Sequence, residues 1–266
     1  MRIPINLSLR SLSAALVLFA IGFGAPSTLA AVDPQRVLAA SDAVRNPGRP
    51  FSVNLALTEF QDGRRVDSNS MISYSRTLAD GGQFATIIRF VVPARDNGKL
   101  MLKDGKDLWF FDPNTKASVR LSPQQRLLGQ ASNGDVVTVN LARDYRATLA
   151  AEEEIQDGEQ KKRRTYKLEL DATNDDATYR RIELWVGSDN NWPIKGHFFA
   201  DSGRLLKTVY YRRFMLQMGA ERPTELVIID GLNPGSVTLM RLTEYTSKSL
   251  PVNWFQRDHL PRFQPE

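Results

Sequence analysis

Three short apolar runs between Ile87 and Pro113 constrain the fold more than any other part of the chain. The runs are Ile87–Val92, Lys99–Lys103 and Leu108–Phe111, separated by Asn97-Gly98 and Asp104-Gly105. Asn-Gly and Asp-Gly accept positive φ at the central positions of a hairpin turn, so we predict a three-stranded antiparallel meander. Large apolar side chains fall on both faces of these strands, whereas a sheet with one face in water alternates cleanly. We therefore expect something other than water to cover the second face.

Strand and turn signals recur along the rest of the chain at intervals near ten residues. Strands are expected from Phe51 and around Met71–Arg76, Glu153–Gln156, Arg164–Leu170, Tyr179–Val186, Ile194–Ala200, Leu206–Arg213, Thr224–Asp230 and Ser236–Tyr245. This spacing is typical of an all-β sandwich or barrel, and no linker rich in Pro, Gly or Ser divides it. We predict a single domain over residues 31–266. Its fold class is mainly β (α+β), an incomplete antiparallel β-barrel of about eleven strands with short helices covering the concave face.

Three helices are expected beside these strands. Asp33-Pro34 is an N-cap followed by proline, and helical spacing of apolar residues continues to Asn46-Pro47-Gly48. Ser122-Pro123-Gln124-Gln125 has the form of a capping box, which predicts a helix over Ser122–Ala131. Leu141, Tyr145 and Leu149 share one helical face, which predicts a second over Leu141–Leu149. Helices inserted into a sheet protein must dock on an apolar face, and the two-sided meander offers one for these two.

The first thirty residues have the pattern of a secretory signal peptide. Arg2 and Arg10 flank the start, Leu12–Phe23 is apolar, and Thr28-Leu29-Ala30 places small residues at a cleavage site. The apolar run is shorter than the ~20 residues that span a bilayer. We therefore predict export out of the cytoplasm, with cleavage near Ala30.

The composition and the missing motifs narrow the function. The chain has no cysteine, which excludes disulfides, thiolate catalysis and Cys-ligated zinc. Its net charge of +5 is only weak evidence for nucleic-acid binding, and we expect no nucleic-acid partner. The basic tract Lys161–Arg164 either attracts anionic lipid or protects a hairpin end from edge pairing.

Catalytic signatures are also missing. The chain has no nucleophile elbow, no zinc-protease helix motif and no phosphate-binding loop, and it has only two histidines, His197 and His259. The acidic run Glu152–Glu154 is typical of a solvated element end, and Asn174-Asp175-Asp176 lacks the glycine and glutamate of a calcium loop. We predict that the protein is not an enzyme and needs no metal or cofactor.

The sequence resembles a known family. Arg-Phe-Val-x-Pro at Arg89–Pro93, the run Asn97–Leu102, Asp-Leu-Trp-Phe-Phe-Asp-Pro at Asp107–Pro113 and the segment Ser122–Tyr145 are similar to the LolA-like periplasmic proteins that sort outer-membrane lipoproteins. The resemblance covers about residues 34–263. The matching positions within the motifs are Arg89, Phe90, Pro93, Leu100, Trp109, Phe111 and Pro113.

The resemblance implies a half-barrel with a helical lid over an apolar cavity. It further implies a carrier that is exported across the inner membrane to the periplasm, makes peripheral or transient contact with the membrane and acts as a monomer. Such a carrier takes acyl chains of lipoproteins or another lipid from an inner-membrane transporter of ABC or RND type towards the outer membrane. The chain is longer after Glu152 than the best-known sorting chaperone. A sensing or interaction module of an envelope-stress or exporter system is therefore the alternative.

Apolar strand positions supply the expected cavity wall. Burying each CH₂ stabilises a complex by ~0.8 kcal/mol, so a hollow that engulfs one long acyl chain gains on the order of 10 kcal/mol without directional contacts. The assignment depends on the strand face, because a shift of one residue exchanges the two faces. The predicted ligand-binding residues are Leu55, Leu57, Phe84, Ile88, Phe90, Leu100, Leu102, Leu108 and Phe110, with Leu127 and Leu128 from the lid.

Overall fold

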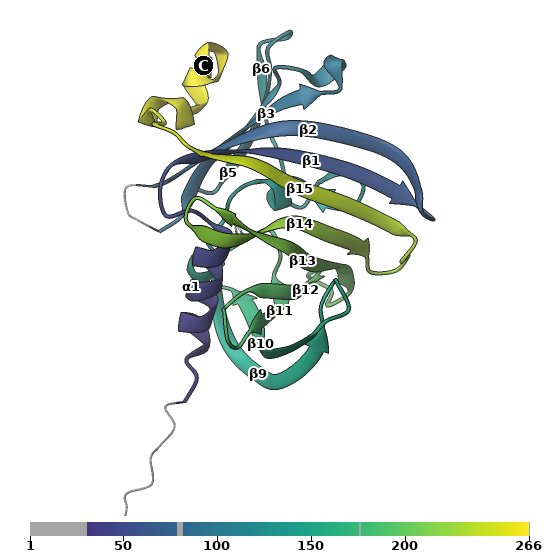
Figure 1. The fold of residues 1–266 in the computed structure, drawn as a ribbon. Helices are drawn as coiled ribbons and strands as arrows, with labels where there is room; N and C mark the ends of the chain where they lie inside the picture. The colour runs from purple at the N-terminus through teal and green to yellow at the C-terminus, as the bar shows by residue number, and fades with distance from the viewer. Residues whose placement is uncertain (1–30, 79–81, 176, 266) are drawn as a thin grey trace, which may run out of the picture. The chain divides into compact units, whose positions relative to one another are not determined.

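Hairpin connections account for nearly all of the strand pairing. The computed structural model describes residues 31–78, 82–175 and 177–265 (Figure 1), so the predicted signal peptide lies outside the described residues. An antiparallel sheet of thirteen strands has the order β6-β5-β4-β3-β2-β1-β15-β14-β13-β12-β11-β10-β9. All neighbours in this sheet are consecutive in the chain except β1 and β15.

The bounds of the elements follow the chain from its first helix to its last turn. The strands are β1 (Phe51–Gln61), β2 (Arg64–Thr77), β3 (Phe84–Val92), β4 (Leu100–Asp104), β5 (Asp107–Asp112), β6 (Ala117–Arg120), β7 (Arg126–Leu128), β8 (Ala131–Ser132), β9 (Tyr145–Gln156), β10 (Lys162–Ala172), β11 (Arg181–Gly187), β12 (Pro193–Phe199), β13 (Leu205–Gln217), β14 (Ala220–Asp230) and β15 (Ser236–Ser247). The helices are α1 (Pro34–Arg45), α2 (Asn133–Val136) and α3 (Leu141–Asp144), with 3₁₀ turns η1 (Ala94–Asp96), η2 (Val252–Phe255) and η3 (Arg257–Arg262).

The central meander is confirmed as β3, β4 and β5, which pair in sequence. Its second turn lies one residue later than predicted, because Asp104 pairs with Asp107 and leaves Gly105 and Lys106 at the centre. Gly105 takes φ +53° there, a conformation that glycine adopts without a steric penalty. The residue type required by the turn was therefore identified correctly, but its position in the turn was not.

The first predicted helix is confirmed and the two lid helices are not. α1 begins after Asp33, whose carboxylate accepts the backbone N–H groups of Gln35 and Arg36 at 3.0 and 3.2 Å. The segment predicted as the helix Ser122–Ala131 contains the β7–β8 hairpin instead. The segment predicted as the helix Leu141–Leu149 is one turn, α3, followed directly by strand β9.

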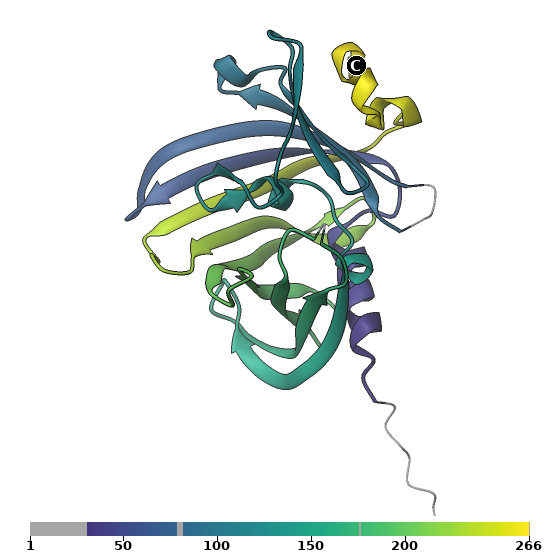
Figure 2. The same cartoon turned by 180° about the vertical axis from the view of Figure 1, so that it is seen from behind.

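The sheet is strongly curved and does not close, so β6 and β9 remain its two edges. Seen from behind, the β7–β8 hairpin and α2 lie across the concave side of the sheet, and α1 runs beside the end that carries β9 to β13 (Figure 2). The predicted fold class, a mainly β incomplete antiparallel barrel with few short helices, is confirmed, but the β7–β8 hairpin takes the place of one of the helices predicted over the concave face. The sheet has thirteen strands where about eleven were predicted.

Apolar residues are buried on both faces of the meander, as the sequence predicts. The larger cluster lies on the concave side, where β1, β3, β11, β13 and β15 contribute residues. On the opposite face Tyr74, Ile87 and Leu102 pack against Leu250 and Phe255 of the C-terminal segment. We call residues 248–265 the C-terminal strap. Among the described residues no helix is long and apolar enough to cross a bilayer.

Candidate functional site

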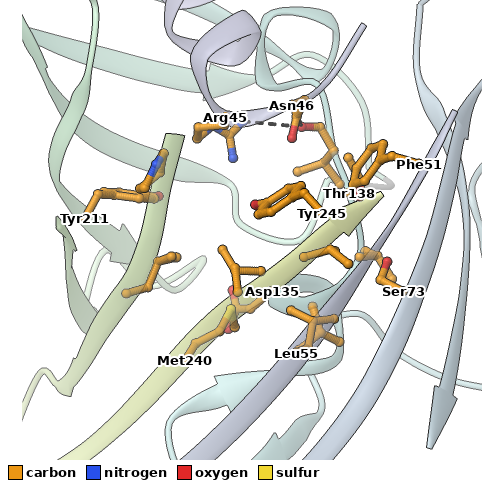
Figure 3. Close-up of a pocket in the computed structure, with 17 residues that line it drawn as sticks. Arg45, Asn46, Phe51, Leu55, Ser73, Asp135, Thr138, Tyr211, Met240 and Tyr245 are labelled. Carbon is orange, nitrogen blue, oxygen red and sulfur yellow. Dashed lines mark hydrogen bonds between the residues drawn. The ribbon is translucent and has the colours of Figure 1, made fainter. Parts of the chain in front are cut away.

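Two adjoining hollows lie between the concave face of the sheet, the C-terminal end of α1 and a short inner segment. Their volumes are about 100 Å³ and 90 Å³. We call the inner segment, residues 132–140, the plug, and the two spaces together the inner hollow; Figure 3 shows the residues that line the first of them. Both spaces are lined by Arg45, Asp135, Val137, Val139, Tyr211, Leu226 and Met240.

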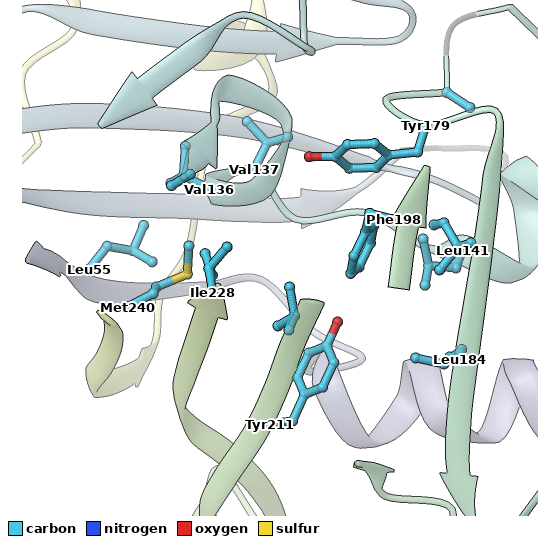
Figure 4. Packing of buried hydrophobic residues seen from close by; sticks show 14 of the residues in the cluster. Leu55, Val136, Val137, Leu141, Tyr179, Leu184, Phe198, Tyr211, Ile228 and Met240 are labelled. Atoms are coloured by element: carbon cyan, nitrogen blue, oxygen red, sulfur yellow. The ribbon is translucent and has the colours of Figure 1, made fainter. Parts of the chain in front are cut away.

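The plug fills the concave side with apolar side chains. Val136 and Val137 are buried and belong to the same cluster as Leu55, Ile228 and Met240 of the sheet (Figure 4). Valine side chains in this position occupy the space between the wall of strands and α1.

Polar contacts hold the N-terminal end of the plug. Asp135 forms an ion pair with Lys207, whose side chain is 4% exposed. The second carboxylate oxygen of Asp135 accepts the hydroxyl of Tyr179 at 2.9 Å. The backbone N–H of Ser132 donates to Asp135 at 2.7 Å. A buried charge is tolerated when it is paired and hydrogen-bonded in this way.

The C-terminal end of the plug is tethered by hydrogen bonds, and all of those described here are neutral except the one from the charged Arg45 guanidinium. The Thr138 and Ser75 hydroxyl oxygens are 2.7 Å apart. The Val139 carbonyl accepts Asn46 Nδ2 at 2.8 Å and Arg45 Nη2 at 3.3 Å. The plug is therefore apolar along its middle and polar at both of its attachments.

Helix α1 is fixed to the sheet at the same place. The Arg222 guanidinium of β14 donates to the carbonyls of Ala43 and Val44 at 2.9 and 2.7 Å, which satisfies acceptors that the helix end leaves free. Asp42 forms an ion pair with Arg45 and accepts the Ala142 N–H at 2.7 Å. Burial alone would lower the pKa of Arg45, but Asp42 outweighs it and raises that pKa, so the guanidinium stays charged.

The chain is similar to a LolA superfamily protein from Nitrosomonas europaea, with 34% identity, a TM-score of 0.76 and coverage of 86% of this chain and 100% of the other. The chain belongs to the LolA superfamily. It is also similar in fold to a DUF1329 family protein from Desulfovibrio piger, with 21% identity, a TM-score of 0.72 and coverage of 86% and 100% of the two chains.

Other comparisons extend this placement. A candidate outer membrane lipoprotein-sorting protein domain from Vibrio parahaemolyticus has the same fold, with 15% identity, a TM-score of 0.70 and coverage of 86% of this chain and 98% of the other. A family model described as an uncharacterized protein matches residues 82–262. No curated protein matches the chain.

The structure of this LolA superfamily member brings eight of the predicted cavity residues into the large apolar cluster on the concave side. They are Leu55, Leu57, Ile88, Phe90, Leu108, Phe110, Leu127 and Leu128. Leu55 lines the inner hollow. Phe90, Phe110 and Leu127 line a separate space of about 300 Å³ between the meander and β7. Whether any of them binds a ligand stays a prediction.

The face assignment was wrong for two residues, Leu100 and Leu102, which point to the opposite side, beneath the C-terminal strap. Phe84 lies on the same face of β3 as Ile88 and Phe90 and forms a small cluster with Phe51 and Val53, which line the inner hollow. Met101 pairs with Ile88 on one side and with Phe110 on the other, so it takes the concave position in β4. A strand with apolar residues at every position carries no alternation from which its inner face can be read.

Sequence reasoning missed the lining from the second half of this LolA superfamily chain. Tyr211, Leu226, Ile228 and Met240 lie on β13, β14 and β15 and line the inner hollow. These strands were predicted, and Val209 and Tyr211 already alternate with polar neighbours. That alternation could have identified which residues face inwards. It does not show whether an inward-facing residue is packed in the core or lines a cavity.

The other candidate sites of the sequence are explained by local contacts. Within the basic tract, Lys161 pairs with Glu159, Lys162 with Glu154 and Arg163 with Asp157, at 3.1, 2.9 and 2.8 Å, as at a charged hairpin end. His197 Nδ1 lies 3.2 Å from a carboxylate oxygen of Glu183. No group of three or more potential metal ligands occurs among the residues that the structure describes.

Proposed function

We propose that this protein is a periplasmic carrier that holds acyl chains of lipoproteins or of another lipid on the concave face of its sheet. The observation that supports this proposal is the plug, an apolar segment with polar attachments that occupies the space a hydrocarbon chain would need. Membership of the LolA superfamily is consistent with that role. Binding would proceed by displacement of the plug, without covalent chemistry.

The size of the inner hollow makes plug movement necessary. A cavity of about 150 Å³ holds one benzene ring, and each of the two spaces is smaller, at about 100 and 90 Å³. A long acyl chain gains on the order of 10 kcal/mol on burial. Each neutral hydrogen bond of the Thr138 attachment contributes only about 1 kcal/mol. Ligand burial therefore exceeds the cost of releasing that end of the plug.

A reversible disulfide tests the displacement directly. The hydroxyl oxygens of Ser75 and Thr138 are 2.7 Å apart, so Ser75→Cys with Thr138→Cys places two sulfur atoms close to bonding distance. The natural chain has no cysteine that could compete. We expect the oxidised double variant to lose binding of a fluorescent acyl probe and to regain it on reduction, while each single variant binds in both conditions.

Binding by the oxidised, locked protein at the level of the natural chain would contradict the displacement mechanism. Gentle purification followed by solvent extraction and mass spectrometry provides an independent test of the carrier role. We expect acylated molecules to co-purify with the natural chain. Protein that neither carries acylated molecules nor binds the acyl probe after delipidation would refute the carrier proposal.

The location and the donor of the cargo are part of the same proposal. We propose that residues 1–30 direct export and that an inner-membrane transporter loads the carrier. Intact-mass measurement of the exported protein should then show a chain that begins at Ala31. Retention of Arg2 and Arg10 in the protein recovered from the periplasm would contradict cleavage at this site.

A further inference from the structure

The inner hollow contains unpaired hydrogen-bond donors that hydrocarbon binding does not require. Arg45 Nε is buried and has no hydrogen-bond partner among the described residues. The hydroxyls of Tyr211 and Tyr245 line the same space and make no hydrogen bond within the part of the chain that the structure describes. Buried polar groups in native proteins are nearly always paired, so the unpaired Arg45 Nε needs an explanation, and the two tyrosine hydroxyls are further unused donors on the same hollow.

These three groups come from different elements and meet at one place. Arg45 ends α1, Tyr211 lies on β13 and Tyr245 lies on β15. Figure 3 shows the side chains of Tyr211 and Tyr245 directed towards the space beside Arg45. The Tyr245 ring is stacked on Phe51 at a centroid distance of 6.0 Å, and the Nη2 atom of Arg45 is held by Asp42. The donors are therefore positioned by contacts that leave them unused.

The protonation of the tyrosines makes them donors at neutral pH. Burial raises the pKa of Tyr245 to about 12 and also raises the pKa of Tyr211. The Nε–H of a guanidinium can only donate. An acceptor atom on a ligand could take a hydrogen bond from all three groups.

The charges around the hollow are already balanced, which favours an uncharged acceptor. Arg45 is paired with Asp42, and Asp135 is paired with Lys207. Asp144 adds a further carboxylate to the lining. Arg222 donates to carbonyls at the end of α1 and does not line the hollow. A ligand carboxylate would bring an additional buried negative charge without a free cation, and such a charge is costly.

We propose that Arg45 Nε, Tyr211 and Tyr245 form a polar subsite that binds the carbonyl oxygen of an ester- or amide-linked acyl chain and disfavours a free fatty acid. The inference rests on the carrier function proposed above and specifies which acyl compounds the hollow accepts. Apolar burial supplies affinity for the chain, and the subsite supplies selectivity for its linkage.

Competition among three ligands of equal chain length tests this selectivity. Delipidated full-length protein is loaded with the fluorescent probe N-phenyl-1-naphthylamine, which is then displaced by methyl palmitate, palmitate or hexadecane. We expect methyl palmitate to displace the probe at a concentration about 10-fold or more below that of the other two, as two or three hydrogen bonds would give.

Matched variants connect the selectivity to the subsite. In Tyr211→Phe with Tyr245→Phe, the advantage of the ester over the alkane should fall by about 5-fold or more, while displacement by hexadecane is unchanged. Tyr210→Phe is the control, because Tyr210 precedes Tyr211 on β13 and does not line the hollow.

Equal displacement by methyl palmitate and hexadecane, or an undiminished ester advantage in the double variant, would overturn the subsite and leave the carrier function intact. Tighter binding of palmitate than of its ester would overturn the preference for an uncharged acceptor. If none of the three ligands displaces the probe and no acylated molecule co-purifies, the carrier function itself fails and the subsite fails with it.

Discussion

Glu225 is buried on the outer face of the sheet, where only 1% of its surface is exposed. Its carboxylate accepts hydrogen bonds from Arg212 Nε at 2.6 Å and from Arg241 Nε at 3.0 Å. Arg213 Nε lies 3.1 Å from one of the carboxylate oxygens. Burial alone would raise the pKa of Glu225, but the hydrogen bonds from Arg241 and Arg212 outweigh burial and lower that pKa. One carboxylate thus joins three arginines on β13 and β15.

The depressed pKa of Glu225 predicts an acid-dependent loss of stability. The unfolded chain binds a proton at this group near pH 4.3, and the folded chain binds it only at lower pH, so the stabilisation is complete above about pH 5. It is lost as the pH falls through the folded pKa. Glu225→Gln should lower the free energy of unfolding at pH 7 by about 1–3 kcal/mol and flatten its decline below pH 5.

Urea denaturation between pH 3 and pH 7 measures this effect. Asp201→Asn is the matched control, because Asp201 is an exposed acid in the turn before β13. The control should have the same free energy of unfolding at pH 7 as the natural chain, and that free energy should decline as steeply when the pH falls. An unaltered pH dependence in Glu225→Gln would show that other carboxylates control the acid response.

Helix α1 also protects one edge of the sheet. The Gln35 side chain donates to the Tyr145 carbonyl at 3.1 Å and accepts the Ala147 N–H at 2.9 Å, so it occupies backbone groups that a further strand would pair. Exposed edges of this kind promote association between chains, and proteins usually cover or charge them. Farther along β9, the exposed run Glu152–Glu154 supplies charge.

Gln35→Ala should expose the start of β9. We expect hydrogen exchange at the Ala147 amide to become about 5–10-fold faster, because one net hydrogen bond contributes about 1 kcal/mol. Exchange resolved by residue, measured on the native protein, checks this. Gln124→Ala, in the exposed turn before β7, should leave that amide unchanged. Unaltered protection in Gln35→Ala would mean that the side chain does not stabilise the edge.

Local sequence signals predicted strands better than the inner segments. Leu141, Tyr145 and Leu149 are spaced by four residues, and an interval of four fits one helical face and one strand face equally well. Backbone pairing with β10 along its whole length makes the segment from Tyr145 onwards a strand, β9, and not a helix. At Ser122–Gln125 the backbone groups that a helix would use are taken by the plug, since the Asn133 N–H donates to the Gln125 carbonyl at 2.9 Å. The local sequence pattern does not predict hydrogen-bond partners from another segment.

The candidate site was only partly predictable for a similar reason. Apolar strand positions identified Leu55 and the concave part of β3, but the polar members of the hollow depend on where α1 and the plug meet the sheet. Arg45 sits near a helix end, a common place for a cation. Its role in the hollow follows only from the packing of α1 against α3, β9 and β14, which is a tertiary feature.

At the scale of the whole molecule, the C-terminal strap makes the meander buried on both faces. Phe255, 4% exposed, lies in the cluster formed with Leu100, Leu102 and Phe111 of the sheet. Trp254 and Phe263 stack edge-to-face at 4.9 Å within the strap. Without this cover, the outer face of β3, β4 and β5 would expose an apolar patch.

Phe255→Ala should therefore destabilise the protein by about 3–5 kcal/mol, the usual cost of removing a buried phenylalanine side chain. Urea denaturation followed by tryptophan fluorescence gives the value, and binding of a hydrophobic dye reports exposure of the patch. Val252→Ala, at a position 64% exposed in the same strap, should change the stability by less than about 0.5 kcal/mol. Equal stability of the two variants would mean that the strap is only loosely attached.

The pairing of β1 with β15 has a consequence for how the protein assembles. Asn54 and Glu244 are joined by a hydrogen bond across this seam although 190 positions separate them in the chain. Each meander on either side can form from neighbours as they emerge, but the seam must wait for the last strand to be made. Until then the two meanders are not joined, and β1 leaves an unpaired strand edge. We therefore expect the chain to be most accessible to chaperones, proteases and other copies of itself before this final pairing step.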